Sequence, residues 1–520
     1  MINSPAVKGP LPASELSLTK KIIAFAVMCV GFFIALLDIQ IVSASLQDIG
    51  GGLSAGRDEV VWVQTAYLIA EIIVIPLSGF FARVLSTRWL FSVSAIGFTV
   101  ASMLCGCAWN IESMIFFRAL QGFLGGSMIP LVFTTAFSFF SGKRTVIAAA
   151  TIGTLASLAP TLGPTIGGWI TDTYSWRWLF FINLVPGAVI SVVVPMLVNI
   201  DKPDFSLLKK IDYAGITFMA LFLGCLEYVL EEGPRFDWMG DTTIRTCAWV
   251  SGLSGVAFVW RGLTAAAPVV DLRALKDLNF ALGCFFSFVT GIGIFGTTYL
   301  TPSFLTGVEH YSALQTGEAV FTIGIFQIMG IPFYTFLARR VDLRWLMMFG
   351  LATFGASMWF YTPITHDWSW RELLLPQALR GFAQSFAVAP AVTLTLGALP
   401  PARLKTASGL FNLMRNLGGA MGIAACATIL VDRTNLHFEH MAEHLTTANA
   451  ALSALEPKFA AMQGQAGALK SLFALTMREA LTQTYSDAFL AISCCFMLAT
   501  VMVPLLRKVT APAAPNRDAH

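Results

Sequence analysis

Three charged side chains occur where hydrocarbon is expected, inside long apolar runs. Asp38 ends the run KKIIAFAVMCVGFFIALL, Glu71 lies within YLIAEIIVIPLSGF, and Arg118 lies within SMIFFRALQGF. A lone charge at the centre of a membrane helix costs at least about 2.5–3.5 kcal/mol, so such charges usually face the protein interior and serve a function. Carboxylates in this position are suited to taking up and releasing protons, and an arginine is suited to pairing with them.

Counting along the predicted helices places two of these charges at one depth. Asp38 lies about 16 residues, or ~24 Å, into a helix that runs outward, and Arg118 lies about 5 residues into a helix that runs inward. Both therefore lie ~6–8 Å below the outer edge of a ~30 Å hydrocarbon core, where we expect them to pair. The pair is either static or part of proton coupling, and we favour coupling.

Glu71 lies deeper, ~16 Å from the outer face and close to the membrane midplane. Gln64, Tyr67 and Glu71 share one helix face, because they follow an i, i+3, i+7 spacing. We interpret Glu71 as a second proton-coupling residue, and Gln64 and Tyr67 as part of a substrate cavity. The alternative is an acid satisfied by a neighbouring hydroxyl or amide.

A second set of polar residues lies in the other half of the chain. Arg415 is predicted near the midplane, with Asn412 and Asn416 beside it. We assign Asn412 and Arg415 to the substrate cavity, where the arginine would attract anionic groups; the alternative is an anchor for a hydrogen bond between helices. Glu227 and Glu318 lie nearer the ends of their spans, where reaching toward the membrane surface is the default.

The amino-acid composition indicates whether the helices that carry these residues lie in water or in a membrane. Of 520 residues, 56% are hydrophobic and 12% are charged, and the mean hydropathy is +0.71. Apolar blocks of about 20 residues recur, which is the length that crosses a ~30 Å hydrocarbon core as a helix. The chain is therefore predicted to be an all-α polytopic membrane protein. The net charge of +3 is small and dispersed, so no nucleic acid partner is expected.

Charge, proline and glycine divide the chain into fourteen predicted spans. WNIESMIFFRALQGF (109–123) and WSWRELLLPQALRGF (368–382) align without a gap, which indicates two repeated halves. We predict two six-helix bundles with two inserted helices, and a substrate site between the bundles.

Lys and Arg concentrate on one side of the predicted membrane spans, which places both termini in the cytoplasm. The predicted divisions are an N-terminal tail 1–20, a first bundle 21–200, inserted helices 201–265, a second bundle 266–508 and a C-terminal tail 509–520.

Residues 431–483, between the last two predicted spans, form the one sizeable extramembrane piece. We predict an amphipathic helical loop on the outer side. His437, His440 and His444 have a spacing that could place three imidazoles on one face. Because acidic residues alternate with them, we interpret this stretch as a solvated helix face, and no metal or other cofactor is predicted.

TLASLAPTLGPTIGGWITD (154–172) is the most specific motif of the chain. Its prolines kink the predicted helix, and its glycines leave a smooth face for close backbone approach. Packing alone is one explanation, but a smooth face between two halves is also what a rocking protein needs. We therefore interpret five residues as a conformational hinge: Pro160, Gly163, Pro164, Gly167 and Gly168.

These motifs resemble those of the major facilitator superfamily, in its fourteen-helix drug:proton antiporter branch, which includes the EmrB-like multidrug exporters. GPTIGGW with Pro160 upstream is similar to the antiporter motif of that family, and SWRWLFFINLVPG (175–187) is similar to its entry to span 6. RALQGFLGG (118–126) is similar to its span-4 arginine motif, so the resemblance implies a proton-coupling role for Arg118. The resemblance covers almost the whole chain and implies the major facilitator fold.

The chain departs from the family pattern in two places. In GFFARVLSTR (79–88), Arg83 stands where the superfamily usually has an aspartate, so the cytoplasmic gating charges are expected to differ. In LDIQIVSASL (37–46) and the residues after it, Gln40, Ser43 and Gln47 replace the usual Thr, Asn and Pro. This difference leaves the substrate open.

The resemblance implies a proton-coupled antiporter that exports amphiphilic drugs or toxic small molecules across the inner membrane by alternating access. FSFFSGKRT has Phe137 where a phosphate-binding loop needs its first glycine, so ATP is not the expected energy source. No catalytic constellation is present, so an enzyme is not expected. The alternatives are a dedicated exporter of one metabolite or siderophore, or a sensor that does not transport. The resemblance also implies a periplasmic adaptor and an outer-membrane channel as partners.

Overall fold

The computed structural model of the protein describes residues 16–43, 45–265, 268–397, 399, 401–443 and 450–507, with the backbone alone for 450–469. In these ranges every regular element is helical, as predicted. The helices of the first half are α1 (Leu18–Ser43), α2 (Leu46–Leu53), α3 (Arg57–Val60), α4 (Trp62–Leu85), α5 (Thr87–Gly106), α6 (Ile111–Phe139), α7 (Lys143–Thr173), α8 (Trp178–Phe181) and α9 (Leu184–Leu197).

Two helices follow the first half, and six more lie in the second half. The following pair is α10 (Tyr213–Glu232) and α11 (Thr242–Thr264). The second half contains α12 (Leu278–Gly307), α13 (Ala313–Leu337), α14 (Leu343–Trp359), α15 (Trp370–Leu396), α16 (Pro401–Glu443) and α17 (Ala450–Met502). Short 3₁₀ turns lie at η1 (Phe205–Lys210), η2 (Trp238–Gly240), η3 (Leu272–Lys276) and η4 (Val503–Leu505).

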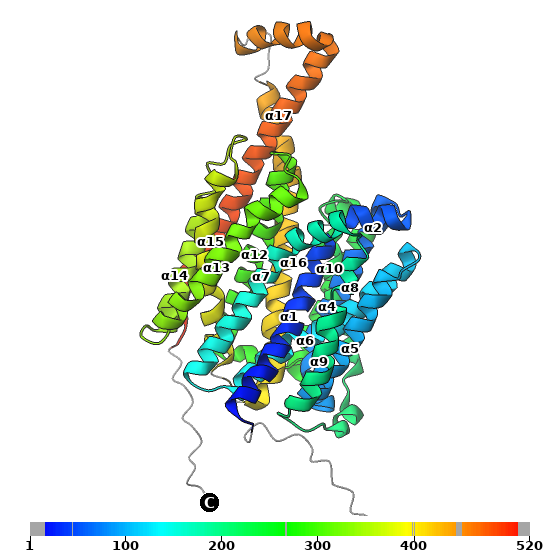
Figure 1. Ribbon diagram of the computed structural model, residues 1–520, viewed down its shortest axis with the longest axis vertical. Helices are drawn as coiled ribbons and strands as arrows, with labels where there is room; N and C mark the ends of the chain where they lie inside the picture. Colours follow the sequence, from blue (N-terminus) through cyan, green and yellow to red (C-terminus); the bar gives the residue numbers. More distant parts are fainter. Residues whose placement is uncertain are drawn as a thin grey trace, which may run out of the picture.

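Each predicted span has a corresponding helix in the described chain. Eleven helical segments have the length and hydropathy of a membrane span, and one of them is formed by α8 and α9 together. The helices α11, α14 and α15 occupy the remaining three predicted positions. In Figure 1 these helices run roughly side by side, and the described chain begins and ends at the lower end. We call this end the terminal side.

The internal repeat is visible in the structure of α6 and α15. Both helices begin with a capping box: the Asn110 side chain accepts from the Ser113 amide at 2.9 Å, and the Ser369 amide donates to Glu372 at 2.9 Å. Three turns later, each helix has a glycine against the backbone of a neighbour. A Cβ at Gly122 would lie 2.3 Å from a carbonyl oxygen of α4, and a Cβ at Gly381 would lie 2.2 Å from one of α13. The two halves therefore use the same packing device.

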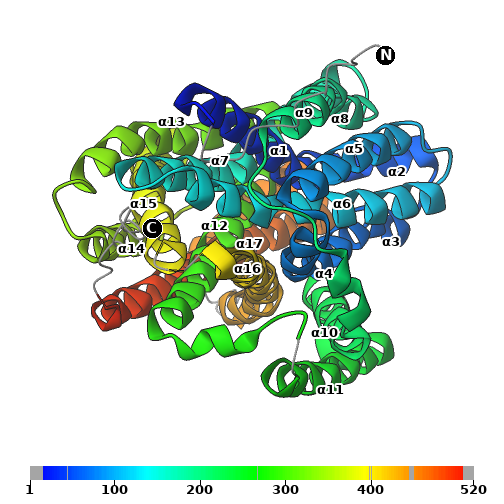
Figure 2. The same cartoon turned by 90° about the horizontal axis from the view of Figure 1, so that it is seen from below.

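Two seams join the halves. The helix α7 lies beside α13 and α15, and α4 lies beside α16. Figure 2 also shows α10 and α11 at the periphery, with α10 between α11 and α4. The inserted helices therefore flank the α4–α16 seam.

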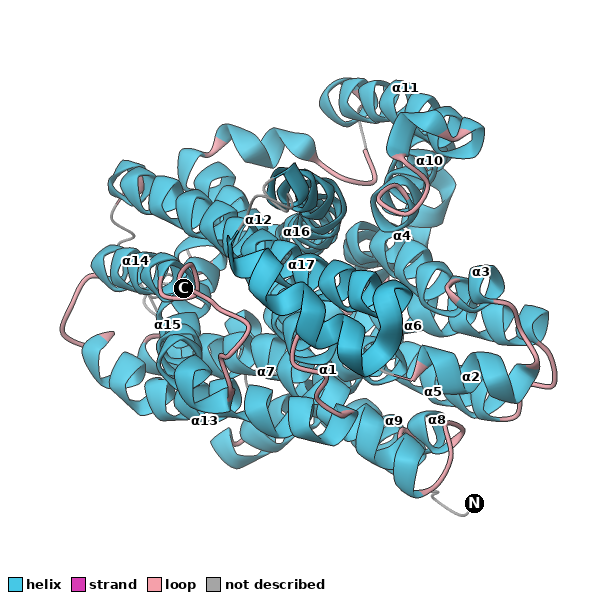
Figure 3. Ribbon diagram, turned by 90° about the horizontal axis from the view of Figure 1, so that it is seen from above, coloured by secondary structure: helices cyan, strands magenta, loops and turns pink. Residues whose placement is uncertain are grey.

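The segment 431–483 is helical where the structure describes it, as predicted, and its helices are continuous with those of the bundle. Residues 431–443 continue α16, and residues from 450 onward form the first part of α17, so both helices extend beyond the bundle as an arm (Figure 1). Seen from above, the arm stands over the middle of the bundle (Figure 3). We call this end the arm side.

Contacts between the two helices hold the base of the arm together. The Thr434 hydroxyl donates to the Thr484 hydroxyl at 3.1 Å, and a ring nitrogen of His437 lies 2.8 Å from a carboxylate oxygen of Asp487. His440 is exposed, and His444 lies outside the described residues. Among the described residues, no group of His, Cys, Asp and Glu is arranged to hold a metal ion. His437 therefore has a structural partner.

Candidate functional site

Asp38 of α1 and Arg118 of α6 form a fully buried ion pair, which is the pairing expected from their depths. One terminal nitrogen of Arg118 donates to Asp38 and, at 2.8 Å, to the side chain of Gln121. The Nε of Arg118 donates to the carbonyl of Val63 in α4 at 3.0 Å. The arginine therefore ties α1, α4 and α6 together.

Two amides complete the surroundings of Asp38. Its second oxygen accepts from Gln121 at 3.0 Å and from Asn183 at 2.8 Å. Asn183 also donates to the Ser102 hydroxyl at 3.0 Å. These partners were not predicted, although Gln121 lies one turn from Arg118 and Asn183 lies in a quoted family motif. With a guanidinium and two amides bound, Asp38 is satisfied in its ionised form.

Tyr67 belongs to this charged cluster. The guanidinium carbon of Arg118 lies 4.2 Å from the centroid of the Tyr67 ring, and the Tyr67 hydroxyl donates to the carbonyl of Ala35 at 3.1 Å. The ring is fully buried, so it stacks on the cation inside the first half. Gln64, which was predicted to line the substrate cavity together with Tyr67, instead donates to Glu231 of α10 at 3.5 Å. The two residues therefore have different surroundings.

Glu71 faces the second half of the chain. Its side chain is almost fully buried, and Gly126 of α6 lies directly behind it. Arg415 of α16 is 3% exposed and lies within electrostatic reach of Glu71. The helix α16 also packs closely against α12, because a Cβ at Gly291 of α12 would lie 2.1 Å from the carbonyl oxygen of Arg415. The packing of α6 and α12 therefore fixes this acid and this base on opposite sides of the seam.

Buried polar atoms without hydrogen-bond partners gather at this seam. An unsatisfied buried polar group costs about 1–3 kcal/mol, so a cluster of them indicates a place that water, a proton or a ligand fills. The side-chain amide nitrogen of Asn412 donates to the carbonyl of Ser408 at 2.9 Å, and the side-chain oxygen of Asn412 has no hydrogen-bond partner. In the described chain, the unpartnered atoms here are Oε1 of Glu71, Nε and Nη2 of Arg415, and the side-chain oxygens of Asn412 and Asn416.

Gly163 and Gly167 of the α7 motif do not lie on the face toward the second half, which differs from the expectation for these two glycines. A Cβ at Gly163 would lie 2.2 Å from the Cβ of Gln40, and a Cβ at Gly167 would lie 2.5 Å from the carbonyl oxygen of Ile41. These glycines therefore seat α7 on α1 within the first half. The other predicted hinge residues lie on the same helix; Pro160 and Gly168 are buried and Pro164 is half-buried.

The face of α7 toward the second half carries hydroxyl side chains and backbone carbonyls. The amide of Gln327 in α13 donates to the Ser157 hydroxyl and, at 3.1 Å, to the Thr154 carbonyl. Gly163 follows Thr154 by nine positions, which is roughly half a turn around a helix. The two surfaces of α7 therefore point in opposite directions, one to α1 and one to α13.

An ion pair between the halves lies on the terminal side. Lys405 of α16 pairs with Asp201, which lies between α9 and η1, and donates to the Ala82 carbonyl at 3.0 Å. Asp201 also accepts from the Thr87 amide at 3.1 Å. Both charged side chains are mostly buried. Asp201 thus supplies a carboxylate close to the loop in which Arg83 replaces the usual family aspartate.

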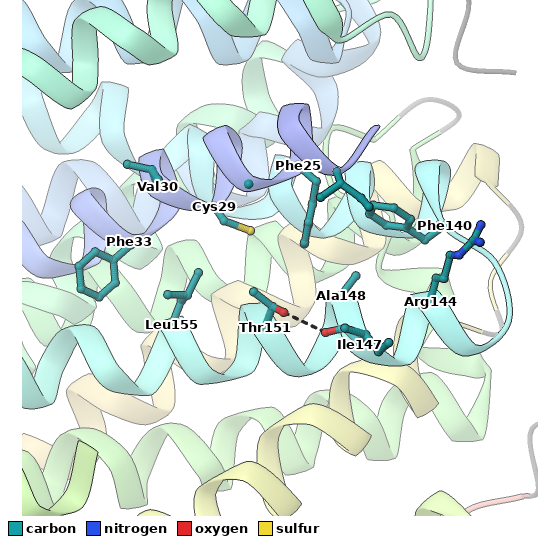
Figure 4. Close-up of a pocket in the computed structure, with 12 residues that line it drawn as sticks. Phe25, Cys29, Val30, Phe33, Phe140, Arg144, Ile147, Ala148, Thr151 and Leu155 are labelled. Atoms are coloured by element: carbon teal, nitrogen blue, oxygen red, sulfur yellow. Dashed lines mark hydrogen bonds between the residues drawn. The ribbon is translucent and has the colours of Figure 1, made fainter. Parts of the chain in front are cut away.

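A separate groove of about 610 Å³ lies between α1 and α7 (Figure 4). Its walls are almost entirely apolar, and Arg144 is the charged residue that lines it. Because Val30 and Ile147 on its rim are exposed, the groove opens on the outer surface of the bundle. It is distinct from the seam between Glu71 and Arg415. Figure 4 labels most of its lining: Phe25, Cys29, Val30, Phe33, Phe140, Arg144, Ile147, Ala148, Thr151 and Leu155.

These features define a class of protein: a multi-pass helical membrane protein with two repeated halves and buried charges on both sides of the seam between them. The profile of the Major Facilitator Superfamily matches residues 28–423 and 284–513. The chain belongs to the Major Facilitator Superfamily.

Named relatives place it near the EmrB proteins of that family. It is 38% identical over 469 residues to the "Colistin resistance protein EmrB" of Acinetobacter baumannii, covering 89% of this chain and 92% of the relative. It is 30% identical over 418 residues to the "Multidrug export protein EmrB" of Escherichia coli K12, covering 80% of this chain and 81% of the relative.

Solved structures share the fold at low identity. The human organic anion transporter MFSD10 superposes with a TM-score of 0.58 at 15% identity, covering 93% of this chain and 99% of the other. The proton:xylose symporter XylE superposes with a TM-score of 0.58 at 12% identity, covering 95% of this chain and 97% of the other. The predicted fold class is therefore confirmed.

Proposed function

We propose that the protein is a proton-coupled antiporter that exports amphiphilic drugs or toxic small molecules across the inner membrane by alternating access, and that it is not an enzyme. Its EmrB relatives, one of them named a multidrug export protein, support this assignment. The observation that carries the proposal is the placement of Glu71 and Arg415 on opposite halves, buried and incompletely satisfied. We propose this seam as the substrate cavity and Glu71 as the main proton carrier.

Proton and substrate are coupled through the relation between the halves. When Glu71 is ionised, its attraction to Arg415 favours the arrangement in which α4 and α16 are close. When Glu71 is protonated, that attraction is lost, and Arg415 becomes available to another partner. A proton and a substrate that favour different arrangements are linked thermodynamically, and they need not touch one another.

The Asp38–Arg118 pair has a supporting part in this cycle. Asp38 already accepts from a guanidinium and two amides, so protonating it would break several hydrogen bonds at once. Arg118 also lies within electrostatic reach of Glu71. We propose that Asp38 and Tyr67 hold Arg118 in place, so that its positive charge stays at a fixed position near Glu71.

The terminal side is the cytoplasmic side in this proposal, with both termini in the cytoplasm. The Lys405–Asp201 pair then closes the cytoplasmic end, because it joins α16 of the second half to the end of the first half. Opening toward the cytoplasm requires this pair to separate.

The arm provides a surface for partners outside the membrane. It continues α16 and α17, which are 43 and 53 residues long, well beyond the ~20 residues that cross a bilayer. We propose that the arm contacts a periplasmic adaptor that leads to an outer-membrane channel. Shortening the arm between residues 440 and 475 should abolish crosslinking to a co-expressed adaptor, and unchanged crosslinking would exclude the arm as the docking site.

The transport proposal is tested with purified protein in proteoliposomes. An imposed proton gradient should drive the lipophilic cation ethidium across the membrane, and a protonophore should abolish that transport. Movement of ethidium that does not respond to the gradient would contradict proton coupling. A panel of other amphiphiles would then separate a multidrug exporter from an exporter of a single compound.

A further inference from the structure

The inserted helix α10 forms part of the wall of the α4–α16 seam. Gly224 of α10 lies against Ile73 of α4, and the Tyr228 ring stacks on Trp62 at 5.3 Å between centroids. After α10 ends, the indole nitrogen of Trp238 donates to the Thr428 hydroxyl of α16 at 3.2 Å. The inserted segment is thus fastened to both helices that carry the proposed substrate cavity.

Glu227 points into this wall, which corrects the expectation that it reaches toward the membrane surface. Its side chain is 4% exposed, and its Oε2 has no hydrogen-bond partner among the described residues. A buried carboxylate is costly when charged and unpartnered. Glu227 lies within electrostatic reach of Glu71, whose Oε1 is also buried and unpartnered. Two acids from different helices therefore face a common interior.

Further carboxylates continue from Glu227 toward the arm side. Glu231 lies one helical turn later, about 6 Å along the axis, and accepts a hydrogen bond from Gln64 of α4. Glu232 is buried, and one of its oxygens lies 3.7 Å from Arg235, which pairs with the exposed Asp58. Acidic side chains thus form a series from the surface toward Glu71.

The other groups around this series are compatible with proton movement. Tyr299 of α12 lies within electrostatic reach of Glu231, and Arg415 of α16 lies opposite Glu71. From α11, Cys247 faces Cys225 and Tyr228 of α10. One cation, Arg235, thus lies at the outer end of the series, and another, Arg415, lies at its inner end, where it attracts a carboxylate that has lost its proton.

We propose that Glu227 and Glu231 of the inserted helix α10 form the route by which protons reach Glu71 from the arm side. In each step a carboxylic acid gives its proton to the next carboxylate, directly or through one water, so that no other bond changes. This inference rests on the proposed antiporter function, which it extends by giving the inserted pair of helices a role in coupling.

The test compares Glu227→Gln and Glu231→Gln with the wild-type protein in proteoliposomes, using ethidium as the probe. Each variant should lower the initial rate of ethidium transport driven by a pH gradient by at least about tenfold, the scale of a coupling interaction. Ethidium binding in detergent, followed by fluorescence, should stay within about threefold of wild type, because the acids carry protons and not the probe. Glu227→Asp, which keeps the carboxyl group, should restore part of the rate.

Glu318→Gln is the matched control, because it removes an exposed carboxylate from α13 by the same substitution and should leave both measurements unchanged. Wild-type rates in both Glu227→Gln and Glu231→Gln would overturn the proposed route. Parallel loss of binding and transport would also overturn it, since the acids would then bind the cationic probe. If the wild-type protein itself shows no gradient-driven transport, the proposed function fails, and that outcome is distinguishable from failure of the route.

Discussion

Glu71 of α4 and Arg415 of α16 carry opposite charges on the two halves of the chain, and both are buried with polar atoms that have no hydrogen-bond partner. Asp38 and Arg118 lie within one half and share a dense set of hydrogen bonds, although one terminal nitrogen of Arg118 also has no partner. The first relationship can change when the halves move, whereas the second lies within one half. The first two of the following predictions depend on this difference.

Substitutions of Arg415 should lower proton-driven transport, and a substitution that keeps the positive charge should lower it less. We expect Arg415→Gln to lower gradient-driven ethidium transport at least about tenfold, because Glu71 loses its opposite charge across the seam. Arg415→Lys should retain part of the activity, since it keeps the charge but not the planar guanidinium. The measurement is the initial transport rate in proteoliposomes. Arg433→Gln, on the exposed part of α16, serves as the control; equal rates in all variants would refute the prediction.

The contributions of Asp38 and Arg118 to the stability of the protein should depend on one another. Removing one member of a buried pair typically costs about 3–5 kcal/mol, because the other charge stays buried without a partner. We therefore expect Asp38→Asn to lower the unfolding temperature in detergent, and Asp38→Asn combined with Arg118→Gln to lower it by less than the sum of the single changes. Strict additivity in this double-mutant cycle would show that the pair contributes no interaction energy.

The Lys405–Asp201 pair should control access from the terminal side. Asp201→Lys places two positive charges together, so we expect the halves to separate there and a cysteine introduced at the buried Ser408 to react faster with a maleimide. The exchange Asp201→Lys with Lys405→Asp restores an ion pair and should slow the reaction again. Fast labelling in the exchanged protein would mean that the two charges do not form the gate.

The glycines of α7 should be sensitive to one added methyl group. A Cβ at Gly163 would lie only 2.2 Å from the Cβ of Gln40, so Gly163→Ala must displace α7 from α1. Overpacking of this kind costs roughly 1–3 kcal/mol, and we expect a lower unfolding temperature in detergent. Gly252→Ala on α11 is the matched control, because a Cβ there meets no atom within 4 Å. Equal unfolding temperatures for the two variants would contradict the packing of α7 on α1.

Some features of the site followed from the sequence because they depend on regular helix geometry. The pairing of Asp38 with Arg118 needed only the rise per residue and the thickness of the membrane. The repeat at Gly122 and Gly381 was visible because both halves solve the same packing problem. Helices at the fourteen predicted positions followed from the length of the apolar blocks, and eleven helical segments of the described residues have the length and hydropathy of a span.

Other features depend on tertiary arrangement and carry no local signal. Asp201 and Lys405 are 204 positions apart in the sequence, and neither lies in a distinctive motif. Glu227 looked like a residue near a span end, and only the packing of α10 against the α4–α16 seam turns it inward. The helical character of the arm was predicted, but its continuity with the membrane helices was not, because these helices lose their apolar character outside the membrane while continuing without a break.

The central claim is that Glu71 carries the proton that drives export. The most direct measurement is proton release on ethidium binding to purified protein in weakly buffered detergent solution, recorded with a pH indicator for wild type, Glu71→Gln and the control Glu318→Gln. We expect proton release from wild type and from Glu318→Gln, and none from Glu71→Gln although ethidium still binds. Proton release of wild-type size from Glu71→Gln would contradict the assignment of Glu71 as the proton carrier.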